Sequence, residues 1–314
     1  MARSTSSPVA TSGTANDAVP GRPLAFHLLL SLRPAQWSKN LLVFAGLLFG
    51  RRLFDGAAVV DAIAAFAVFC GLSGAVYLVN DIADRDSDRL HPLKRHRPIA
   101  SGALTVPVAA AVALGLAVAG LAAAYTIGPA FASVAAAYLA LQIMYSFALK
   151  HIVIIDVLTI AIGFVLRAVG GAVAVRVEIG QWLLVCTILL ALFIALAKRR
   201  HEILLLAEGA VSHRRILGEY SAYLLDQMIA VVSASTLISY VFYTMSPETQ
   251  AKFGTAWLGL TIPFPLYGIF RYLYLVHQRE GGGSPADLLL TDRPLLACVA
   301  LWALTVALII YRPV

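Results

Sequence analysis

Apolar residues run through most of the chain in long stretches, and the polar residues gather between them. A helix needs roughly 20 apolar residues to cross a bilayer. About nine stretches have this character, the first of them short: 38–50, 57–79, 104–125, 128–147, 152–174, 180–197, 226–245, 254–276 and 294–311. None alternates with period two like the strands of a membrane barrel, so backbone hydrogen bonds must be satisfied within helices. The pattern predicts an all-α integral membrane protein with about nine transmembrane helices.

The N-terminal region lacks such a stretch. Residues 1–21 are rich in Ser, Thr and Ala and do not show the basic and then apolar segments of a signal peptide, which predicts a disordered tail. The next segment, RPLAFHLLLSLRPAQW, is too short to span before Pro34 interrupts it, so an interfacial helix is expected. Residues 22–314 are expected to form a single transmembrane domain.

Composition and charge agree with this class and predict an orientation. Hydrophobic residues make up 60% of the chain and charged residues 13%, unlike a soluble domain. Loops rich in Lys and Arg stay cytoplasmic, and a cytoplasmic N-terminus places most of the 24 basic residues on that side. We therefore expect a multi-pass plasma-membrane protein with its C-terminus outside. The net charge of +7 indicates an anionic ligand at the inner face and not nucleic acid, because no soluble basic domain exists.

Four aspartates follow the second apolar stretch, in the segment NDIADRDSDRL. If the helix continues through them, Asp81, Asp84 and Asp88 lie within about 60° of one another on one face. Asn80 then neighbours Asp84 at the i, i+4 spacing, while Asp86 points away. Two carboxylates about 6 Å apart repel by roughly 3 kcal/mol at an effective dielectric constant near 20, so this face needs a counter-charge.

Two interpretations of that counter-charge are open. Magnesium typically takes one or two carboxylates and completes its shell with water and substrate phosphate oxygens. Alternatively, the aspartates pair with Arg85, Arg89 and the basic run that follows, on a solvated loop. The N-D-x-x-D-x-x-x-D spacing at the mouth of a membrane helix favours a site for metal and phosphate.

Basic residues cluster at the same predicted face of the membrane. Lys94, Arg95 and Arg97 follow the aspartates and can donate charge-assisted hydrogen bonds to phosphate oxygens beside the metal. Lys198 and Arg199 end the sixth predicted span. The alternative role for any of these cations is to anchor the inner face to anionic lipid.

Charges inside predicted spans are costly, at about 2.5 to 3.5 kcal/mol each on insertion scales. Asp156 and Arg167 share a face of the fifth span but stand about 16 Å apart along its axis, so they cannot pair with each other. Asp156 is expected near the mouth, with Lys150 and Tyr145. Arg167 is expected deeper, either as a functional residue or as a structural one that bonds to helix carbonyls.

The motif around the aspartates resembles a known family. Asn80, Asp81, Asp84 and Asp88, followed by RPIASG at 97–102, are similar to the hallmark of the UbiA superfamily of membrane prenyltransferases. The resemblance extends from about residue 24 to the end of the chain. It implies nine helices around a central cavity that opens to the cytoplasmic side, with two aspartate-rich regions that bind Mg²⁺ and a diphosphate.

One departure from the family pattern points to a branch. The second acidic region, YSFALKHIVIID, contains only Asp156. Together with LRPAQWSKNLLVFAGLLF and AKRRHE, this resembles the decaprenyl-phosphate phosphoribosyltransferases of actinobacteria. The branch implies transfer of phosphoribose from phosphoribosyl pyrophosphate to a polyprenyl phosphate, with release of pyrophosphate, as a step toward the arabinose donor lipid of cell-wall arabinan.

This reaction must hold a diphosphate, a ribose phosphate and a lipid phosphate together, which requires many cations. We expect Asp81, Asp84 and Asp88 to hold Mg²⁺ and to be essential for catalysis. The expected substrate-binding residues are Lys39, Asn80, Lys94, Arg95, Arg97, Tyr145, Lys150, Asp156, Arg167, Lys198 and Arg199.

Two other functions are open at this stage. The first is an aromatic prenyltransferase of the same fold that uses a prenyl diphosphate donor. The second is a transporter of lipid or ions, although the sequence shows no matching polar set at mid-membrane or at the outer mouth. A homo-oligomer is also possible.

Overall fold

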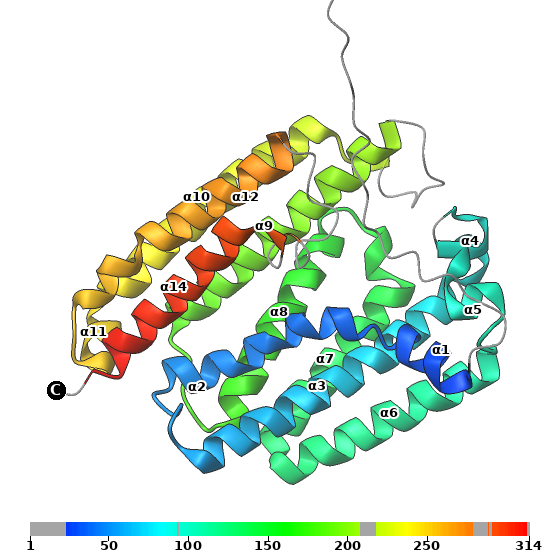
Figure 1. The fold of residues 1–314 in the computed structure, drawn as a ribbon, viewed down its shortest axis with the longest axis horizontal. Coiled ribbons are helices and arrows are strands. Elements are labelled where there is room, and N and C mark those ends of the chain that lie inside the picture. Colours follow the sequence, from blue (N-terminus) through cyan, green and yellow to red (C-terminus); the bar gives the residue numbers. More distant parts are fainter. Residues whose placement is uncertain (1–22, 93, 208–217, 279–287, 289–290, 313–314) are drawn as a thin grey trace, which may run out of the picture.

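Helices form all the regular structure that the computed structural model describes, which comprises residues 23–92, 94–207, 218–278, 288 and 291–312 (Figure 1). The predicted all-α class is confirmed, while the expected tail at 1–21 lies outside the described residues. The helices are α1 (Leu24–Ser31), η1 (Pro34–Phe44), α2 (Ala45–Phe49), α3 (Gly56–Ala83), α4 (Arg85–Leu90), η2 (Lys94–His96), α5 (Pro98–Ser101), α6 (Val106–Ile127), α7 (Pro129–Phe147), η3 (Leu149–His151), α8 (Ile155–Ala174), α9 (Gln181–Ala207), α10 (Ala222–Met245), α11 (Pro247–Phe253), η5 (Trp257–Thr261), α12 (Pro263–Gln278) and α14 (Arg293–Ile310).

Seven of the described helices are long and apolar enough to cross a membrane: α3, α6, α7, α8, α9, α10 and α14. An eighth span results if α11 and the helices after it, which are bent by 101° at a short break, are counted as one. The protein is therefore a multi-pass membrane protein. The expected first span, 38–50, is not one α-helix but the end of η1 followed by α2.

The 3₁₀ geometry of η1 explains how so short a segment extends through the bundle. A 3₁₀ helix rises about 2.0 Å per residue, so the 11 residues of η1 and the 5 of α2 together cover roughly 30 Å. This is about the thickness of the hydrocarbon core. The segment runs antiparallel to α3, from Arg33 beside Asp81 to Leu47 packed with Ala58 and Ala62.

Glycine allows η1 to pack directly on the backbone of α8. A Cβ atom added to Gly171 would lie 1.9 Å from the carbonyl oxygen of Val43. A Cβ on Gly46 would likewise lie 2.9 Å from Cα of Ala172. No larger residue fits at this crossing without moving one backbone away from the other.

The helices begin and end where their sequences favour it. Asp55 caps α3 by accepting hydrogen bonds from two backbone N–H groups, and Ser221 and Asp292 cap α10 and α14 in the same way. Proline stands in the first two positions of α5, α6, α7, α11 and α14, where its missing N–H leaves no helical hydrogen bond unmade.

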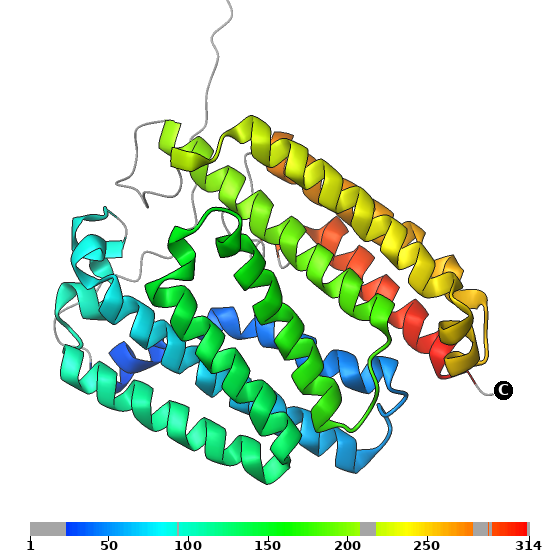
Figure 2. The same ribbon diagram turned by 180° about the vertical axis from the view of Figure 1, so that it is seen from behind.

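The packed core has two main parts. One lies between α3 and α7, where the rings of Phe69 and Phe131 meet edge to face with centroids 5.9 Å apart. The other joins α9, α10 and α12 through buried residues such as Phe193, Ile229 and Leu275. Seen from behind, α6 to α10 follow one another side by side (Figure 2).

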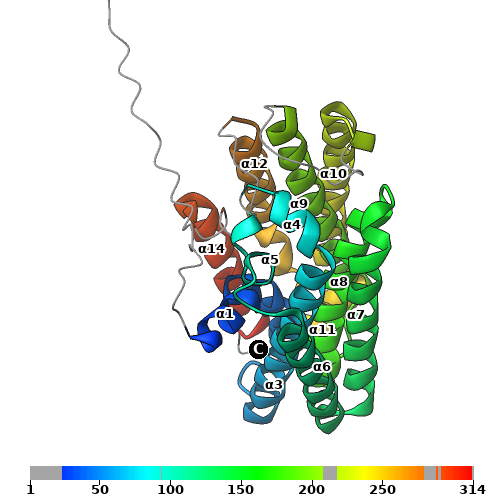
Figure 3. The same ribbon diagram turned by 90° about the vertical axis from the view of Figure 1, so that its right-hand side faces the viewer.

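The alternating chain direction gathers several helix ends at one end of the bundle. There α3 and α9 end, α8 and α10 begin, and the short helices α4 and α5 lie (Figures 1 and 3). The helices α2 and α11 and the C-terminus lie at the opposite end (Figure 1). The end with α4 and α5 therefore carries the acidic and basic segments that the sequence singles out.

Candidate active site

Three aspartates come together where α3 gives way to α4. Asp84 links the two helices with nearly helical backbone, since its N–H bonds back onto α3 at 2.9 Å and its carbonyl accepts from the N–H of Asp88 at 2.8 Å. Asp81 and Asp88 are 2% and 3% exposed, whereas the side chain of Asp86 is 94% exposed. Burial therefore divides the four carboxylates in the way that the predicted shared face does.

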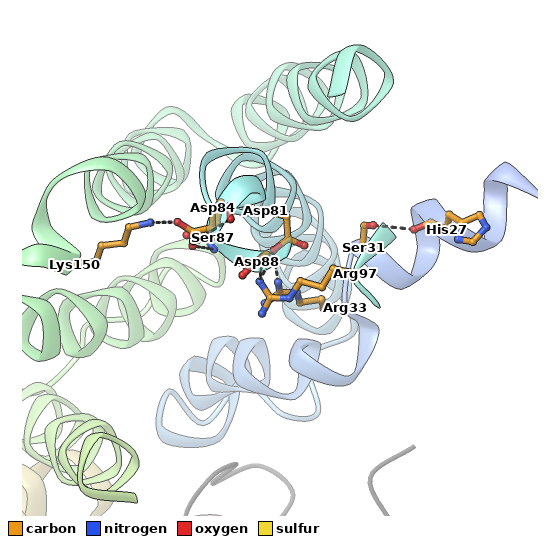
Figure 4. Close-up of polar contacts among 10 residues, drawn as sticks. His27, Ser31, Arg33, Asp81, Asp84, Ser87, Asp88, Arg97 and Lys150 are labelled. Atoms are coloured by element: carbon orange, nitrogen blue, oxygen red, sulfur yellow. Dashed lines mark hydrogen bonds and ion pairs between the residues drawn. The ribbon is translucent and has the colours of Figure 1, made fainter. Parts of the chain in front are cut away.

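The guanidinium group of Arg97 lies between two of these carboxylates. Its Nη1 donates to Asp81 Oδ1 at 3.1 Å and to Asp88 Oδ2 at 2.7 Å (Figure 4). Arg33 donates through Nη2 to the same oxygen of Asp81 (Figure 4). Both arginine side chains are 27% exposed, so they reach the buried carboxylates from the surface.

Lys150 approaches the third carboxylate from the opposite side. It belongs to η3, between α7 and α8, and its Nζ lies 2.6 Å from Asp84 Oδ1 (Figure 4). The side-chain amide of Asn80 donates to Asp84 Oδ2 at 3.2 Å, as the i, i+4 spacing predicts. The structure thus brings Asn80, Arg97 and Lys150, all expected site residues, onto the aspartate face.

Arg33 is a member of this cluster that the sequence analysis did not identify. It stands between α1 and η1 with a φ of 52°, and its guanidinium lies 4.9 Å from the centroid of the Tyr77 ring. The only signal in the sequence is a cation directly before Pro34, where the first helix is interrupted. Its partner Asp81 is 48 residues away, so local pattern could not pair them.

Charge pairing, the alternative interpretation of the acidic segment, is partly observed. Arg97, from the basic run, pairs with two of the three aspartates of the shared face. Arg89 instead lies 4.0 Å from the exposed Asp86 and donates to the carbonyl oxygen of Ala100. The cations on the shared face thus come from the α1–η1 junction, the basic run and η3, and they neutralise a buried site and not a solvated loop.

A second acidic residue at this end, Asp156, is enclosed by its partners. Its Oδ1 accepts from the hydroxyl of Tyr220 at 2.8 Å, and its Oδ2 lies 2.7 Å from Arg199 Nη2, an ion pair whose angles are not those of a hydrogen bond. Arg199 also bonds to Glu202 and Tyr145. Asp156 is 0% and Arg199 4% exposed. The structure joins Asp156 to Tyr220 and Arg199 in a closed cluster, with Tyr145 bonded to Arg199, whereas Lys150, which was expected beside Asp156, pairs with Asp84.

Arg167 lies apart from both acidic clusters, and the structure supplies the partners that the sequence could not. Its Nε donates to Asn40 Oδ1 at 2.6 Å, its Nη2 to the hydroxyl of Tyr138 at 2.7 Å, and its Nη1 to the carbonyl of Gly163 at 2.9 Å. Ser73 extends the network through contacts with Asn40 and Tyr138. These three hydrogen-bond partners of Arg167 are neutral, and they belong to η1, α7 and α8.

The remaining expected site residues are four cations, Lys39, Lys94, Arg95 and Lys198, which lie in η1, η2 and α9. Arg95 is exposed and donates to the ring of His96, while Lys94 lies in η2 with its backbone N–H donated to His91 Nδ1. The side chain of Lys198 is 48% exposed and lies within α9, which continues to Ala207, and Lys39 is half-buried in η1.

The chemistry of the aspartate face fits a magnesium ion that substrate helps to bind. Two carboxylates, Asp81 and Asp88, already converge on one cationic nitrogen of Arg97, and carboxylate oxygens are the ligands that Mg²⁺ prefers. Among the described residues no group of three His, Cys, Asp or Glu side chains is arranged to hold a metal. In this arrangement two carboxylates would share the ion with phosphate oxygens, as is usual for Mg²⁺.

Comparison with known proteins identifies the family. The chain matches the UbiA prenyltransferase family over residues 39–279. It is 34% identical to the decaprenyl-phosphate phosphoribosyltransferase of Corynebacterium glutamicum, over 93% of this chain and 89% of that protein. It is 32% identical to the enzyme of the same name from Mycobacterium tuberculosis, over 91% and 95% of the two chains. These matches confirm the resemblance that the motifs indicated.

A solved structure confirms the fold. The chain resembles a UbiA homolog from Archaeoglobus fulgidus, solved with GPP and Mg²⁺ bound, with a TM-score of 0.70 over 91% of this chain and 99% of that one. The two sequences are 19% identical, so the likeness concerns the fold alone.

Proposed function

The chain belongs to the UbiA prenyltransferase family, and we propose that it transfers phosphoribose from phosphoribosyl pyrophosphate to a polyprenyl phosphate, releasing pyrophosphate. The observation that carries this choice is the similarity, over more than nine tenths of the chain, to enzymes named decaprenyl-phosphate phosphoribosyltransferase. The product is then a lipid-linked phosphoribose, which we place upstream of the arabinose donor for cell-wall arabinan.

The geometry of the aspartate face suits a reaction with several phosphates. Arg33, Arg97 and Lys150 meet three carboxylates at the α3–α4 junction. The two arginines are about one quarter exposed and can turn from carboxylate to phosphate oxygens without crossing the core. A prenyl diphosphate with a neutral aromatic acceptor would bring fewer negative charges than phosphoribosyl pyrophosphate with a lipid phosphate.

In the proposed step an oxygen of the lipid phosphate forms a bond to C1 of the ribose. The bond between C1 and the pyrophosphate oxygen breaks, and pyrophosphate leaves with the electron pair. A phosphate monoester is substantially ionised near neutral pH, because its second pKa is about 6, so the acceptor needs no strong general base. The chain's cations hold the phosphates in place and stabilise the charge that develops on the leaving group.

Magnesium, when held by Asp81, Asp84 and Asp88, would supply further charge neutralisation for the leaving pyrophosphate. Arg33 and Arg97 would hold phosphate oxygens beside these carboxylates, and Lys150 would do so from the α7–α8 side. We further propose that Lys94 and Arg95 extend this phosphate-binding surface, and that Lys39, Lys198 and the Asp156 cluster flank it.

We place this end of the bundle in the cytoplasm, where the central cavity expected of the family opens, and the C-terminus outside. The bias of basic residues toward the same end supports this orientation. The polyprenyl tail then lies along apolar helices in the membrane while its phosphate reaches the aspartate face.

The test is an assay of purified protein in lipid with labelled phosphoribosyl pyrophosphate and polyprenyl phosphate, with Mg²⁺ or with excess chelator. We expect labelled lipid and pyrophosphate to form together, and only when Mg²⁺ is present. A parallel reaction offers a prenyl diphosphate and an aromatic acceptor. Release of pyrophosphate from the prenyl donor but not from phosphoribosyl pyrophosphate would overturn the proposal in favour of an aromatic prenyltransferase.

A further inference from the structure

The connection between α7 and α8 contains a strained residue close to the site. Ile154 has φ 69° and ψ −44°, a conformation that a β-branched residue rarely adopts. Such strain of about 1–3 kcal/mol persists only where surrounding contacts hold it. The next residue begins α8, so the chain changes direction at this point.

The hydroxyl of Tyr220 supplies the contacts that hold this conformation. It accepts a hydrogen bond from the Ile154 N–H at 2.7 Å and donates one to Asp156 Oδ1 at 2.8 Å. Tyr220 is 4% exposed and stands just before α10. Burial raises the pKa of Tyr220 to about 12, so the hydroxyl keeps its proton and remains a donor to the carboxylate at neutral pH.

The other end of the same connection carries Lys150, which reaches the aspartate face. Lys150 is 4% exposed and its Nζ lies 2.6 Å from Asp84 Oδ1. Between Lys150 and Ile154 the chain has only three residues, so a shift of Ile154 is transmitted to the lysine. The connection is thus fastened to the α3–α4 junction at one end and to Tyr220 at the other.

We propose that Tyr220 is a positioning residue: by holding Ile154 and Asp156 it fixes the place from which Lys150 meets a phosphate group bound at the aspartate face. On this interpretation Asp156 forms a buried polar cluster with Tyr220 and Arg199 and does not form a second metal site. The proposal rests on the proposed function only in taking the aspartate face to bind pyrophosphate, which is common to prenyl and phosphoribosyl donors.

The chain contains a matched control. Tyr272 is also buried in the core that includes Tyr220, and its hydroxyl has no hydrogen-bond partner among the described residues. Tyr220→Phe and Tyr272→Phe therefore remove the same atom from similar surroundings. Only the first removes contacts to Ile154 and Asp156.

The experiment measures binding of inorganic pyrophosphate with Mg²⁺ to purified full-length protein in detergent, by calorimetry, together with its thermal unfolding temperature. We expect Tyr220→Phe to weaken binding about tenfold, the scale of one hydrogen bond to a charged group, and Tyr272→Phe to change it less than twofold. If Tyr220→Phe bound pyrophosphate as tightly as the wild-type protein, the proposal would be overturned.

A double-mutant cycle then separates positioning from general loosening. If Tyr220 acts through Lys150, Tyr220→Phe should have no further effect on pyrophosphate binding once Lys150→Ala is present. An undiminished tenfold effect in that background would contradict the proposal. Because the probe is pyrophosphate alone, the result stands even if phosphoribosyl pyrophosphate proves not to be the donor.

A second variant covers the case in which Tyr220→Phe does not fold. Glycine adopts positive φ without the strain that isoleucine suffers, so Ile154→Gly should remove much of the need for the hydroxyl. We expect the pair Ile154→Gly and Tyr220→Phe to fold and to bind pyrophosphate within about threefold of wild type. A pair that misfolds, or that binds no better than Tyr220→Phe alone, would reject the positioning role.

Discussion

The aspartate face and the Arg167 network both place arginines inside a membrane protein, but they hold them in different ways. At the aspartate face, Arg33 and Arg97 are 27% exposed and pair with the carboxylates Asp81 and Asp88. In the network, Arg167 is 5% exposed and bonds only to neutral groups in the contacts described.

The difference indicates which arginines can exchange partners. A partly exposed guanidinium can leave a carboxylate for a phosphate oxygen, because water and the ligand solvate it during the move. Arg167 has no such route, since it connects Asn40 of η1 with Tyr138 of α7 across the packed interior. We therefore interpret Arg167 as a residue that holds η1 against α7 and α8, which is the structural one of the two roles that the sequence left open.

The largest expected effect is at the aspartate face. Asp81→Asn or Asp84→Asn should lower kcat by at least a hundred- to a thousandfold, because the charge that holds metal and cations is lost. The unfolding temperature of Asp81→Asn should change little, since Arg33 and Arg97 can turn to solvent, whereas Asp84→Asn should lower it more, because the buried Lys150 loses its carboxylate partner. Assays of folded, detergent-purified variants check this, and near-normal turnover in either variant would mean that these carboxylates do not bind the metal.

The second effect should be on stability and not on catalysis. Arg167→Leu should lower the free energy of unfolding by about 2–3 kcal/mol, because Asn40 and Tyr138 lose a charged donor. Adding Asn40→Leu should restore part of this loss, since an apolar pair leaves fewer polar groups unsatisfied. Denaturation in mixed micelles measures both. A folded Arg167→Leu protein with severely reduced kcat would instead assign Arg167 to the chemistry.

A third effect tests how closely η1 must approach α8. Gly171→Ala should destabilise the protein by about 1–3 kcal/mol, because the new Cβ would meet the Val43 carbonyl at 1.9 Å. Gly115→Ala, on α6, is the control, since a Cβ there meets nothing within 4 Å and alanine favours the helix. Equal unfolding temperatures for the two variants would show that η1 is not held as tightly as its contacts indicate.

The smallest effect is expected at the exposed carboxylate. Asp86→Asn should change kcat/KM less than about twofold and stability by no more than about 0.5 kcal/mol, as surface substitutions usually do. Its side chain is 94% exposed, and its one described ion pair, with Arg89 at 4.0 Å, lies on the surface, where such pairs contribute little to stability. If Asp86→Asn lowered kcat/KM as much as Asp84→Asn does, Asp86 would have to be counted among the site residues.

Much of the site could be predicted from sequence where it depends on helical periodicity. The shared face of the aspartates and the pairing of Asn80 with Asp84 follow from spacing along one helix. The contacts of Arg33 with Asp81, and of Lys150 with Asp84, join residues 48 and 66 positions apart. Such pairs depend on how helices pack, which local pattern does not encode.

The sequence by itself determined the class of protein, the seven membrane helices other than the expected spans 38–50 and 254–276, and the acidic face, because hydrophobic runs and 3.6-residue periodicity are local properties. Tertiary structure alone decided which cations neutralise that face. It also decided that Asp156 contacts Tyr220 and Arg199, and that Arg167 donates a hydrogen bond to Asn40. Tertiary structure further decided that the first expected span is the end of a 3₁₀ helix followed by a short α-helix, packed against Gly171. Each of these depends on contacts between segments that meet only in the folded bundle.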